Sequence, residues 1–376
     1  MKNIIYLNNY MNDTVIDARN NKSFYSQPAN NKIKGITECI TSTSNKITII
    51  SSGLMNNKTF KKYKKVYDKL NTTKIIYSEI IDIPLINTLS SIWYIYKEIK
   101  RINKKEHIDN IIFYNDKPEV AFAALIAKKR LKIPITIEYE DGYSNVNSIG
   151  KLKSTIFKFT ENTVSKNVDS AILVNSLLKK RYNVPTVVVR GVVNKELYEE
   201  CKKYDKKHNE VFTILYSGGL DESRGINVLI EALKYIPIEL KLIITGKGNI
   251  KFEDKRIDFK GFIDYEEMKR LMMQADLLVQ CQLVNNSFSD VSFPSKIFEY
   301  IATSNFVISS KVADITDFSE REIIYYDNDD PKDLADRILE VYELWKKGIE
   351  KNIKLEKLCE ANLPENIGHK IINILN

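Results

Sequence analysis

The chain has 376 residues, of which 43% are hydrophobic and 28% charged. This length and composition predict about two or three globular domains rather than a disordered or collagen-like protein. It contains no run of about 18 uncharged apolar residues and no signal-peptide pattern at its start, so we expect a cytoplasmic protein without a transmembrane helix. The four cysteines lie far apart and predict neither a disulfide framework nor a zinc cluster.

Charge is distributed unequally along the chain. Residues 1–190 carry a net charge of +15, whereas residues 191–376 carry −7. A basic half indicates a surface that meets an anionic partner, such as nucleic acid, a phosphate-bearing substrate or a membrane leaflet. No nucleic-acid-binding motif accompanies the charge, so we expect no nucleic acid. Lysines that only solvate the surface are the alternative.

Short β-branched segments alternate with longer amphipathic segments, which is typical of βα units around a mostly parallel sheet. In the first half we expect strands at 2–7, 46–50, 74–76, 110–113, 135–138, 170–173 and 186–189, and helices at 32–41, 57–70, 89–104, 118–130 and 153–167. In the second half we expect strands at 213–216, 241–244, 257–260, 277–280, 306–309 and 323–325, and helices at 226–233, 265–275, 296–302 and 331–347. Two doubly wound domains in series are therefore predicted.

The charged segment 193–210 lacks a strand pattern and is expected to be a linker or surface turn. We therefore expect an N-terminal domain over 1–195 and a C-terminal domain over 206–350. The helical tail 355–376 is expected to pack back on the first domain.

A glycine-rich turn follows the first strand of the second half. Gly218 and Gly219 end the strand, and Gly225 precedes a helix, so the backbone there can approach a phosphate group at a helix N-terminus. Arg224 would add a charge-assisted contact to the same anion. Ordinary turn chemistry is the alternative, and the later turn around Gly246 carries a weaker glycine pattern.

A second candidate segment surrounds Pro294, which predicts a helix start with Ser292 or Phe293 as the cap. Glu299 would then lie about a turn and a half into the helix. From there its carboxylate could reach a ligand at the carboxyl ends of the strands, and it would suit the two hydroxyls of a ribose. A solvent-exposed helix position is the alternative.

A metal site is not expected. The acidic residues Asp327, Asp329 and Asp330 could in principle hold Mg²⁺, but they precede Pro331, where an aspartate caps a helix. The three histidines have no partner at metal-ligand spacing.

Four segments occur in a fixed order over most of residues 211–340, namely ILYSGGLDESRGINVLIEAL, LKLIITGKGN, IDFKGFIDYEEMKRLMMQADLLVQ and SFPSKIFEYIATSNFVISS. Together they resemble the C-terminal domain of the retaining glycosyltransferases of family 4. The resemblance implies an α/β fold of the GT-B type, with two Rossmann-like doubly wound domains facing a central cleft. The N-terminal domain would bind the acceptor and the C-terminal domain the nucleotide sugar. The resemblance also implies transfer of a sugar from a UDP- or GDP-linked donor, with retention of anomeric configuration and without a metal or other cofactor.

The resemblance implies roles for single residues. Arg224 would hold the donor diphosphate, Glu299 the ribose hydroxyls, and the backbone at Phe262 would lie against the base. Gly219 replaces the usual first basic residue of the family, so Lys296 is expected to supply a phosphate contact. Arg224 and Lys296 would then stabilise the negative charge that grows on the leaving diphosphate.

The family's first acidic ligand of the sugar is absent. Val291 stands at its position, with Asp290 next to it, and a subgroup with FPSK-type sequences uses backbone amides there. The full set of residues expected around the nucleotide sugar is Gly218, Gly219, Arg224, Gly246, Phe262, Ser292, Phe293, Pro294, Ser295 and Glu299.

In the first half, LKIPITIEYEDGYSN resembles the family strand that ends in a His-Asp pair. Glu140 and Asp141 take the place of that pair, and either could orient the acceptor hydroxyl or accept its proton. A capped loop is the alternative. The segment 23–36 lies where the family has its acceptor loop, without the glycines of that loop.

Two segments of the basic half, 149–166 and 89–105, mix lysines with aromatic residues. Such stretches can lie on an anionic bilayer, although half-buried helices have the same pattern. We therefore expect peripheral association with the cytoplasmic face of the membrane and a saccharide or lipid-linked saccharide acceptor in polysaccharide biosynthesis.

Two other functions fit the same fold. A catalytically silent scaffold in a polysaccharide assembly complex would explain the family side chains missing at Gly219 and Val291. A non-hydrolysing sugar-nucleotide epimerase would need more histidine and acidic catalytic groups than this chain offers.

Overall fold

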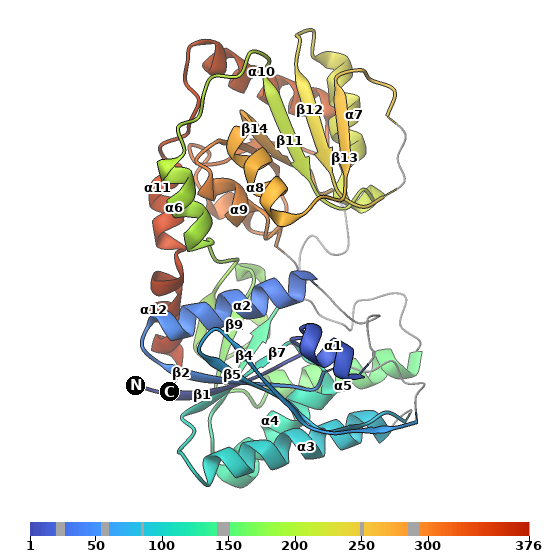
Figure 1. Ribbon diagram of the computed structural model, residues 1–376, viewed down its shortest axis with the longest axis vertical. Coiled ribbons are helices and arrows are strands. Elements are labelled where there is room, and N and C mark those ends of the chain that lie inside the picture. The colour runs from blue at the N-terminus through green and yellow to red at the C-terminus, as the bar shows by residue number, and fades with distance from the viewer. Residues whose placement is uncertain are drawn as a thin grey trace. The chain divides into compact units, whose positions relative to one another are not determined.

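The computed structural model describes residues 1–19, 27–53, 60–83, 86–140, 151–248, 252–284 and 293–375. The chain forms two compact units (Figure 1). Unit 1 is Met1–Val192 with Pro364–Asn376, and unit 2 is Val193–Leu363. Each unit is built on a sheet of mostly parallel strands.

Unit 1 alternates strands with helices. Its strands are β1 (Asn3–Asn8), β2 (Lys46–Ser51), β3 (Lys62–Tyr63), β4 (Val66–Leu70), β5 (Thr73–Tyr77), β6 (Ile80–Ile81), β7 (Asn110–Tyr114), β8 (Ile135–Tyr139), β9 (Ser170–Leu173) and β10 (Thr186–Val188). Its helices are α1 (Asp13–Arg19), α2 (Gln27–Ser42), α3 (Ile86–Asn103), α4 (Pro118–Leu131), α5 (Lys151–Ser165), the 3-10 helix η3 (Ser176–Arg181) and α12 (Pro364–Ile374).

The main sheet of unit 1 has the strand order β10-β9-β8-β7-β1-β2-β5-β4, and all neighbours are parallel except β4 with β5. Buried residues of α1, α2 and α12 form one core with side chains of β1, β2 and β5. The helices α3, α4 and α5 pack against one another, α4 contacting both of the others. The strand order reverses between β1 and β7, so a ligand is expected at the carboxyl ends of these strands.

Unit 2 repeats the same alternation. Its strands are β11 (Thr213–Ser217), β12 (Lys241–Thr245), β13 (Ile257–Gly261), β14 (Leu277–Gln280), β15 (Phe306–Ser310) and β16 (Ile324–Tyr326). Its helices are α6 (Lys195–Lys203), η4 (Glu222–Arg224), α7 (Ile226–Ala232), η5 (Leu233–Tyr235), α8 (Tyr265–Gln274), α9 (Ile297–Ala302), η6 (Ile315–Asp317), α10 (Pro331–Lys346) and α11 (Leu355–Ala361).

The sheet of unit 2 is parallel throughout, in the order β13-β12-β11-β14-β15-β16. Its buried strands are short and apolar, and side chains of α7 and α10 complete one core with β11, β12 and β14. The strand order reverses between β11 and β14. The loops after these two strands are therefore the place where an open α/β sheet binds its ligand.

One expected helix of unit 1 is wrong. Residues 57–70 were expected to be helical, but residues 62–63 and 66–70 are the strands β3 and β4, and 57–59 lie outside the described residues. In β4 half-buried and exposed residues alternate, because the strand forms the antiparallel edge of the sheet beside β5. Lysines interrupt this alternation in the sequence, so the helical and strand periods are hard to separate there.

The segments near the end of each unit also differ from the expectation. In the segment 193–210, residues 195–203 form α6, whose first turn is capped by the Asn194 side chain accepting from the Leu197 N–H (2.9 Å). The expected tail helix over 355–376 is two helices. α11 belongs to unit 2, and α12 belongs to unit 1, where it packs on α2.

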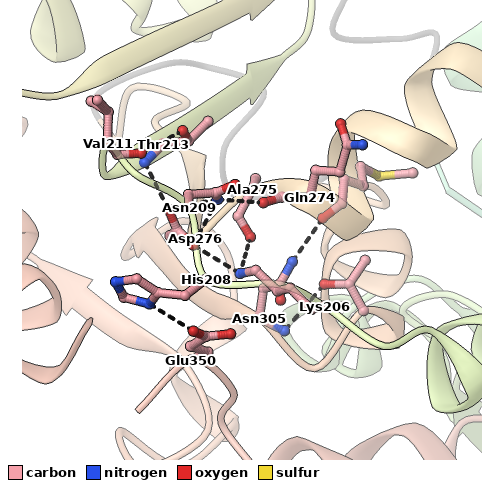
Figure 2. A network of polar contacts seen from close by, with 12 residues as sticks. Lys206, His208, Asn209, Val211, Thr213, Gln274, Ala275, Asp276, Asn305 and Glu350 are labelled. Carbon is pink, nitrogen blue, oxygen red and sulfur yellow. Dashed lines mark hydrogen bonds and ion pairs between the residues drawn. The ribbon is translucent and has the colours of Figure 1, made fainter. Parts of the chain in front are cut away.

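A buried ion pair holds the segment between α6 and β11. Lys206 Nζ lies 3.0 Å from Asp276 Oδ1, and both side chains are only 2% exposed. The ammonium also donates to the Ala275 carbonyl (2.6 Å) (Figure 2). Asp276 accepts further hydrogen bonds from the Thr213 backbone N–H (2.8 Å) and the Asn209 side chain. A segment with a linker composition is thus tied to the amino end of the unit 2 sheet.

The acidic cluster before Pro331 caps a helix, as expected. The Asp330 side chain accepts from the Lys332 N–H (2.9 Å), and Pro331 is the first residue of α10. Within the described residues, no cluster of three or more His, Cys, Asp or Glu could hold a metal ion. In those same residues no helix has the length and apolar character needed to cross a membrane.

Candidate functional site

Two glycine turns meet at the carboxyl ends of β11 and β12. The Gly218 N–H donates to the Thr245 carbonyl (3.0 Å), and the Gly246 N–H donates to the Gly261 carbonyl (2.8 Å). Gly246 has φ 144°, and a Cβ there would lie 1.7 Å from the Gly218 carbonyl oxygen. Only glycine permits this close approach. Gly246 therefore shapes the turn, and its N–H is already used within the protein.

Arg224 ends η4 and is held in place by the residue that follows it. Gly225 has φ 68°, and a Cβ there would lie 1.7 Å from the carbonyl oxygen of Cys281, just after β14. The Arg224 guanidinium is 55% exposed, with Nε 3.8 Å from Asp221 Oδ2 and Nη1 3.4 Å from Gln282 Oε1. Both contacts are long, so the guanidinium can turn towards an anion.

Lys296 lies beside this turn. Its Nζ donates to the Ser217 carbonyl (2.8 Å) and to Ser217 Oγ (2.7 Å), at the end of β11. An ammonium has three donors, and two of them are used within the described residues, so the third is open to another acceptor there. Lys296 thus joins α9 to the strand end, a contact that places a second cation near Arg224.

The charges of the site act on one another. Burial lowers the pKa of Lys296, and the positive charge of Arg224 lowers it further, while Glu299 opposes both effects. Burial raises the pKa of the Glu299 carboxyl, and Lys296 opposes this effect. The structure therefore brings together Arg224, Lys296 and Glu299, which the sequence singled out. An anion between the two cations would relieve their repulsion.

The helix that carries Glu299 begins later than expected. α9 starts at Ile297, and the preceding residues form a turn in which the Ile297 N–H donates to the Pro294 carbonyl (3.1 Å). Glu299 consequently lies in the first turn of the helix. Lys296 occupies the cap position, so Phe293 is not the cap, and Ser292 lies outside the described residues.

The other residues expected around the nucleotide sugar are divided between the protein core and its surface. Phe293 is buried and its ring packs on Phe298 and Phe318, and Pro294 is buried as well. Their side chains are therefore unavailable to a ligand. Ser295 is exposed.

An exposed aromatic ring follows the end of β13. Phe262 follows β13 and is 72% exposed, and Lys247 Nζ lies 4.3 Å from its ring centroid. An exposed phenylalanine ring of this kind can stack on a flat ligand group. Lys247 and Gln282 were not singled out from the sequence. Both lie in loops after β12 and β14, so the strand pattern that predicted the site could have included them.

In unit 1, Glu140 lies at the end of β8. Its carboxylate is paired with Lys32 Nζ at 2.8 Å and accepts a hydrogen bond from Tyr114 Oη (2.5 Å). Its backbone N–H donates to Asn115 Oδ1 (2.8 Å). Asp141 lies outside the described residues. The side chain and backbone of Glu140 are therefore both fixed by contacts within unit 1.

A second carboxyl group lies beneath this pair. Glu138 in β8 is fully buried and accepts a hydrogen bond from the Tyr6 hydroxyl of β1. Burial and the neighbouring Glu140 raise the pKa of Glu138 to about 8, although Lys32 opposes them. The two carboxylates together raise the pKa of Lys32 despite its burial. Glu138 was not predicted as a site residue, although a charged residue within an otherwise apolar strand pattern could have indicated it.

The raised pKa of Glu138 predicts a pH dependence of stability. The folded protein binds this proton more tightly than the unfolded chain does. The free energy of unfolding should therefore fall as the pH rises from about 5 to about 8, by up to about 1.4 kcal/mol per pH unit. Glu138→Gln removes the titrating group and should flatten this slope. Urea unfolding followed by circular dichroism at several pH values measures it.

The matched control is Glu239→Gln, since Glu239 is exposed. That variant should keep the wild-type slope. Equal slopes in the wild type and Glu138→Gln would show that Glu138 is ionised in the folded protein and contradict the prediction.

Comparison with known proteins places a family on the part of the chain that carries the Arg224 site. Residues 211–343 match the family model described as glycosyl transferases group 1. This segment therefore resembles a glycosyltransferase domain. An uncharacterised glycosyltransferase of Methanocaldococcus jannaschii is 26% identical over 277 residues, which are 70% of this chain and 74% of that relative. These matches support glycosyltransferase activity on sugar donors.

Solved glycosyltransferase structures share the whole fold. Sucrose-phosphate synthase of Thermosynechococcus elongatus matches with a TM-score of 0.69 and 14% identity over 99% of this chain and 98% of that chain. Anabaena HepE in complex with UDP matches with a TM-score of 0.65 and 14% identity, and in complex with UDP-glucose with 0.63 and 11%, each over 100% of this chain and 99% of that chain. The predicted GT-B fold with two Rossmann-like domains is confirmed.

Proposed function

We propose that this glycosyltransferase moves a sugar from a nucleotide-diphosphate sugar to a saccharide or lipid-linked saccharide acceptor, with retention of configuration and without a metal, in cell-surface polysaccharide or glycan biosynthesis. The observation that carries the proposal is the pair of cations, Arg224 and Lys296, at the β11/β14 reversal of the sheet. A diphosphate bound there would neutralise them. That a homologous fold in HepE was solved with UDP and UDP-glucose supports a nucleotide-sugar donor.

The two cations suit the bond that must break. As the bond from the anomeric carbon to the diphosphate lengthens, negative charge grows on the leaving oxygen. Arg224 can contact two phosphate oxygens through its planar guanidinium, and Lys296, which uses two of its three N–H groups among the described residues, can contact a third oxygen. Because Ser217 already fixes the ammonium, little reorganisation is needed when the charge develops.

Glu299 and Phe262 would hold the nucleoside. No hydrogen bond to the Glu299 side chain occurs within the described ranges, so its half-buried carboxylate can accept from two ribose hydroxyls. The exposed ring of Phe262 could stack on the base. Both would bind the donor without taking part in bond breaking.

In unit 1, Glu140 would orient the acceptor. Lys32 and Tyr114 hold its carboxylate in place, so it can accept a hydrogen bond from the hydroxyl that attacks the sugar. We therefore assign it positioning of the acceptor rather than complete removal of the proton.

The proposal is tested with a panel of UDP- and GDP-linked sugars, with release of the nucleoside diphosphate as the readout and an anomer-specific analysis of any product. Turnover that persists with chelator present supports the proposal. Tight nucleotide binding without turnover of any donor would instead favour the silent scaffold, and conversion of the donor at C2 without release would favour the epimerase.

Glu299→Ala should change how the protein distinguishes ribose from deoxyribose. Hydrogen bonds to a charged group contribute about 1.5–3 kcal/mol, so the wild type should bind the preferred nucleoside diphosphate roughly 10- to 150-fold more tightly than its 2′-deoxy analogue. In Glu299→Ala this ratio should fall close to one. Isothermal titration calorimetry with UDP, GDP and both deoxy analogues measures it.

Glu239→Ala is the control, because Glu239 is an exposed glutamate elsewhere in unit 2. It should keep the wild-type ratio. A Glu299→Ala protein that still prefers the ribonucleotide would remove Glu299 from the ribose site.

A further inference from the structure

An apolar groove lies between α3 and α4 of unit 1. It has a volume of about 450 Å³ and is lined by Leu89, Ile92, Trp93, Tyr96, Ile126 and Arg130. Leu89 is 68% exposed and Trp93 61% exposed. Large apolar side chains this exposed and this close together mark an interaction surface rather than scattered surface residues.

The apolar surface continues from α4 to α5. The rings of Phe122 on α4 and Phe159 on α5 stack with centroids 6.4 Å apart. Phe159 is 63% exposed and Ile156, one turn earlier on α5, is 41% exposed. Three neighbouring helices thus present apolar side chains to solvent, and we call them the α3–α5 surface.

Basic residues outnumber acidic residues on these helices. Their basic residues are Lys97, Lys100, Arg101, Lys128, Lys129, Arg130, Lys151, Lys153 and Lys158, and their acidic residues are Glu98, Glu119 and Glu161. Each of the three carboxylates is withdrawn from solvent or paired. Glu98 is paired with Lys65 and Arg101, Glu161 with Arg181, and Glu119 is buried. Lys97, Lys100, Lys129, Arg130 and Lys158 are exposed.

We propose that the α3–α5 surface docks on an anionic lipid bilayer, with Leu89 and Trp93 inserted at the level of the headgroups. Apolar anchors surrounded by lysine and arginine are the combination that holds a helix in a membrane interface. Tryptophan is suited to that depth, since its ring is apolar and its N–H polar. Nucleic acid would satisfy the charge but would leave the groove empty. The proposal is independent of the sugar transfer proposed above.

Intrinsic fluorescence gives a direct test, because the chain has two tryptophans and Trp345 is buried in unit 2. Vesicles of phosphatidylglycerol and phosphatidylcholine should shift the emission to shorter wavelength, and brominated lipid should quench it. Pure phosphatidylcholine vesicles should have little effect. Trp93→Phe should still bind the vesicles but should lose both signals. Emission that is unchanged although the protein co-sediments with vesicles would place Trp93 outside the bilayer and overturn the proposal.

Charge variants test the electrostatic part. Each cation near an anionic surface adds about 1 kcal/mol, or about fivefold in binding. The double variant Lys129→Gln/Arg130→Gln should therefore bind anionic vesicles about 25-fold more weakly. The control Lys34→Gln/Lys255→Gln loses the same charge from exposed lysines on α2 and in unit 2, and should bind within about threefold of wild type.

Two results would overturn the proposal. Equal weakening in both double variants would mean that binding reflects net charge alone. A concentration-dependent shift of Trp93 emission without lipid, together with dimers in analytical ultracentrifugation that Leu89→Ser abolishes, would assign the surface to a second copy of this chain.

Discussion

Arg224→Ala is expected to lower the rate of sugar transfer by about 10²–10³, the usual loss when one charge-stabilising donor is removed from a transition state. The loss should fall mainly on kcat, because the charge on the diphosphate grows as the bond breaks. Stability should change little, since the guanidinium is 55% exposed and makes only long contacts within the described residues. The measurement is steady-state turnover of the active donor, with thermal unfolding as a check on folding.

Arg270→Ala provides a matched control for this variant. Arg270 is 63% exposed and lies 3.8 Å from a glutamate three residues earlier, which is nearly the setting of Arg224 beside Asp221. Its replacement should leave turnover within about threefold of wild type. Arg224→Lys keeps the charge but loses the bidentate contact, so its turnover should lie between those of the wild type and Arg224→Ala. Unchanged kcat in Arg224→Ala would end the assignment of the diphosphate to this turn.

Lys206→Met is expected to destabilise unit 2 by about 3–5 kcal/mol, because it leaves the Asp276 carboxylate buried without its cation. Burial lowers the pKa of Lys206 although Asp276 raises it, because removing the ammonium from water costs free energy that the ion pair only partly offsets. Urea unfolding followed by Trp345 emission in a Trp93→Phe background reports on unit 2, since Trp345 is its tryptophan.

Lys202→Met is the corresponding control. Lys202 is paired with Glu356 at 3.3 Å, but both side chains are about half exposed, at 44% and 55%. An exposed pair contributes about 0–1 kcal/mol, so this variant should be nearly as stable as wild type. Similar losses of stability in Lys202→Met and Lys206→Met would show that burial of the Lys206–Asp276 pair has no special effect.

The elements and the two-domain fold could be predicted because their signals are local. A run such as TILYS followed by two glycines and an amphipathic helix specifies a strand, a turn and a helix within about twenty residues. Arg224 and Gly225 belong to that local pattern. The error at 62–70 arose where lysines interrupt a short edge strand, and neither period dominates.

The charge pairs of the molecule could not be predicted in this way. Lys32 and Glu140 are 108 positions apart and Lys206 and Asp276 are 70 apart, and each pair meets only because the fold brings distant segments of the chain together. A sequence that gives the type of a residue does not give its partner or its burial. The segment 204–210 has the composition of a linker, yet Lys206 within it is almost completely buried.

The sequence by itself therefore determined the βα periodicity, the glycine turn beside Arg224 and the unequal charge of the two halves, because these depend on neighbouring residues or on sums over them. Only the tertiary structure decided that Lys296 is fixed by Ser217 beside Arg224, that Glu138 is a buried acid, and that apolar side chains of α3 and α4 line a groove together with Arg130. The physical reason is that burial and electrostatic interaction depend on distances in space. Packing sets those distances between residues that are far apart along the chain.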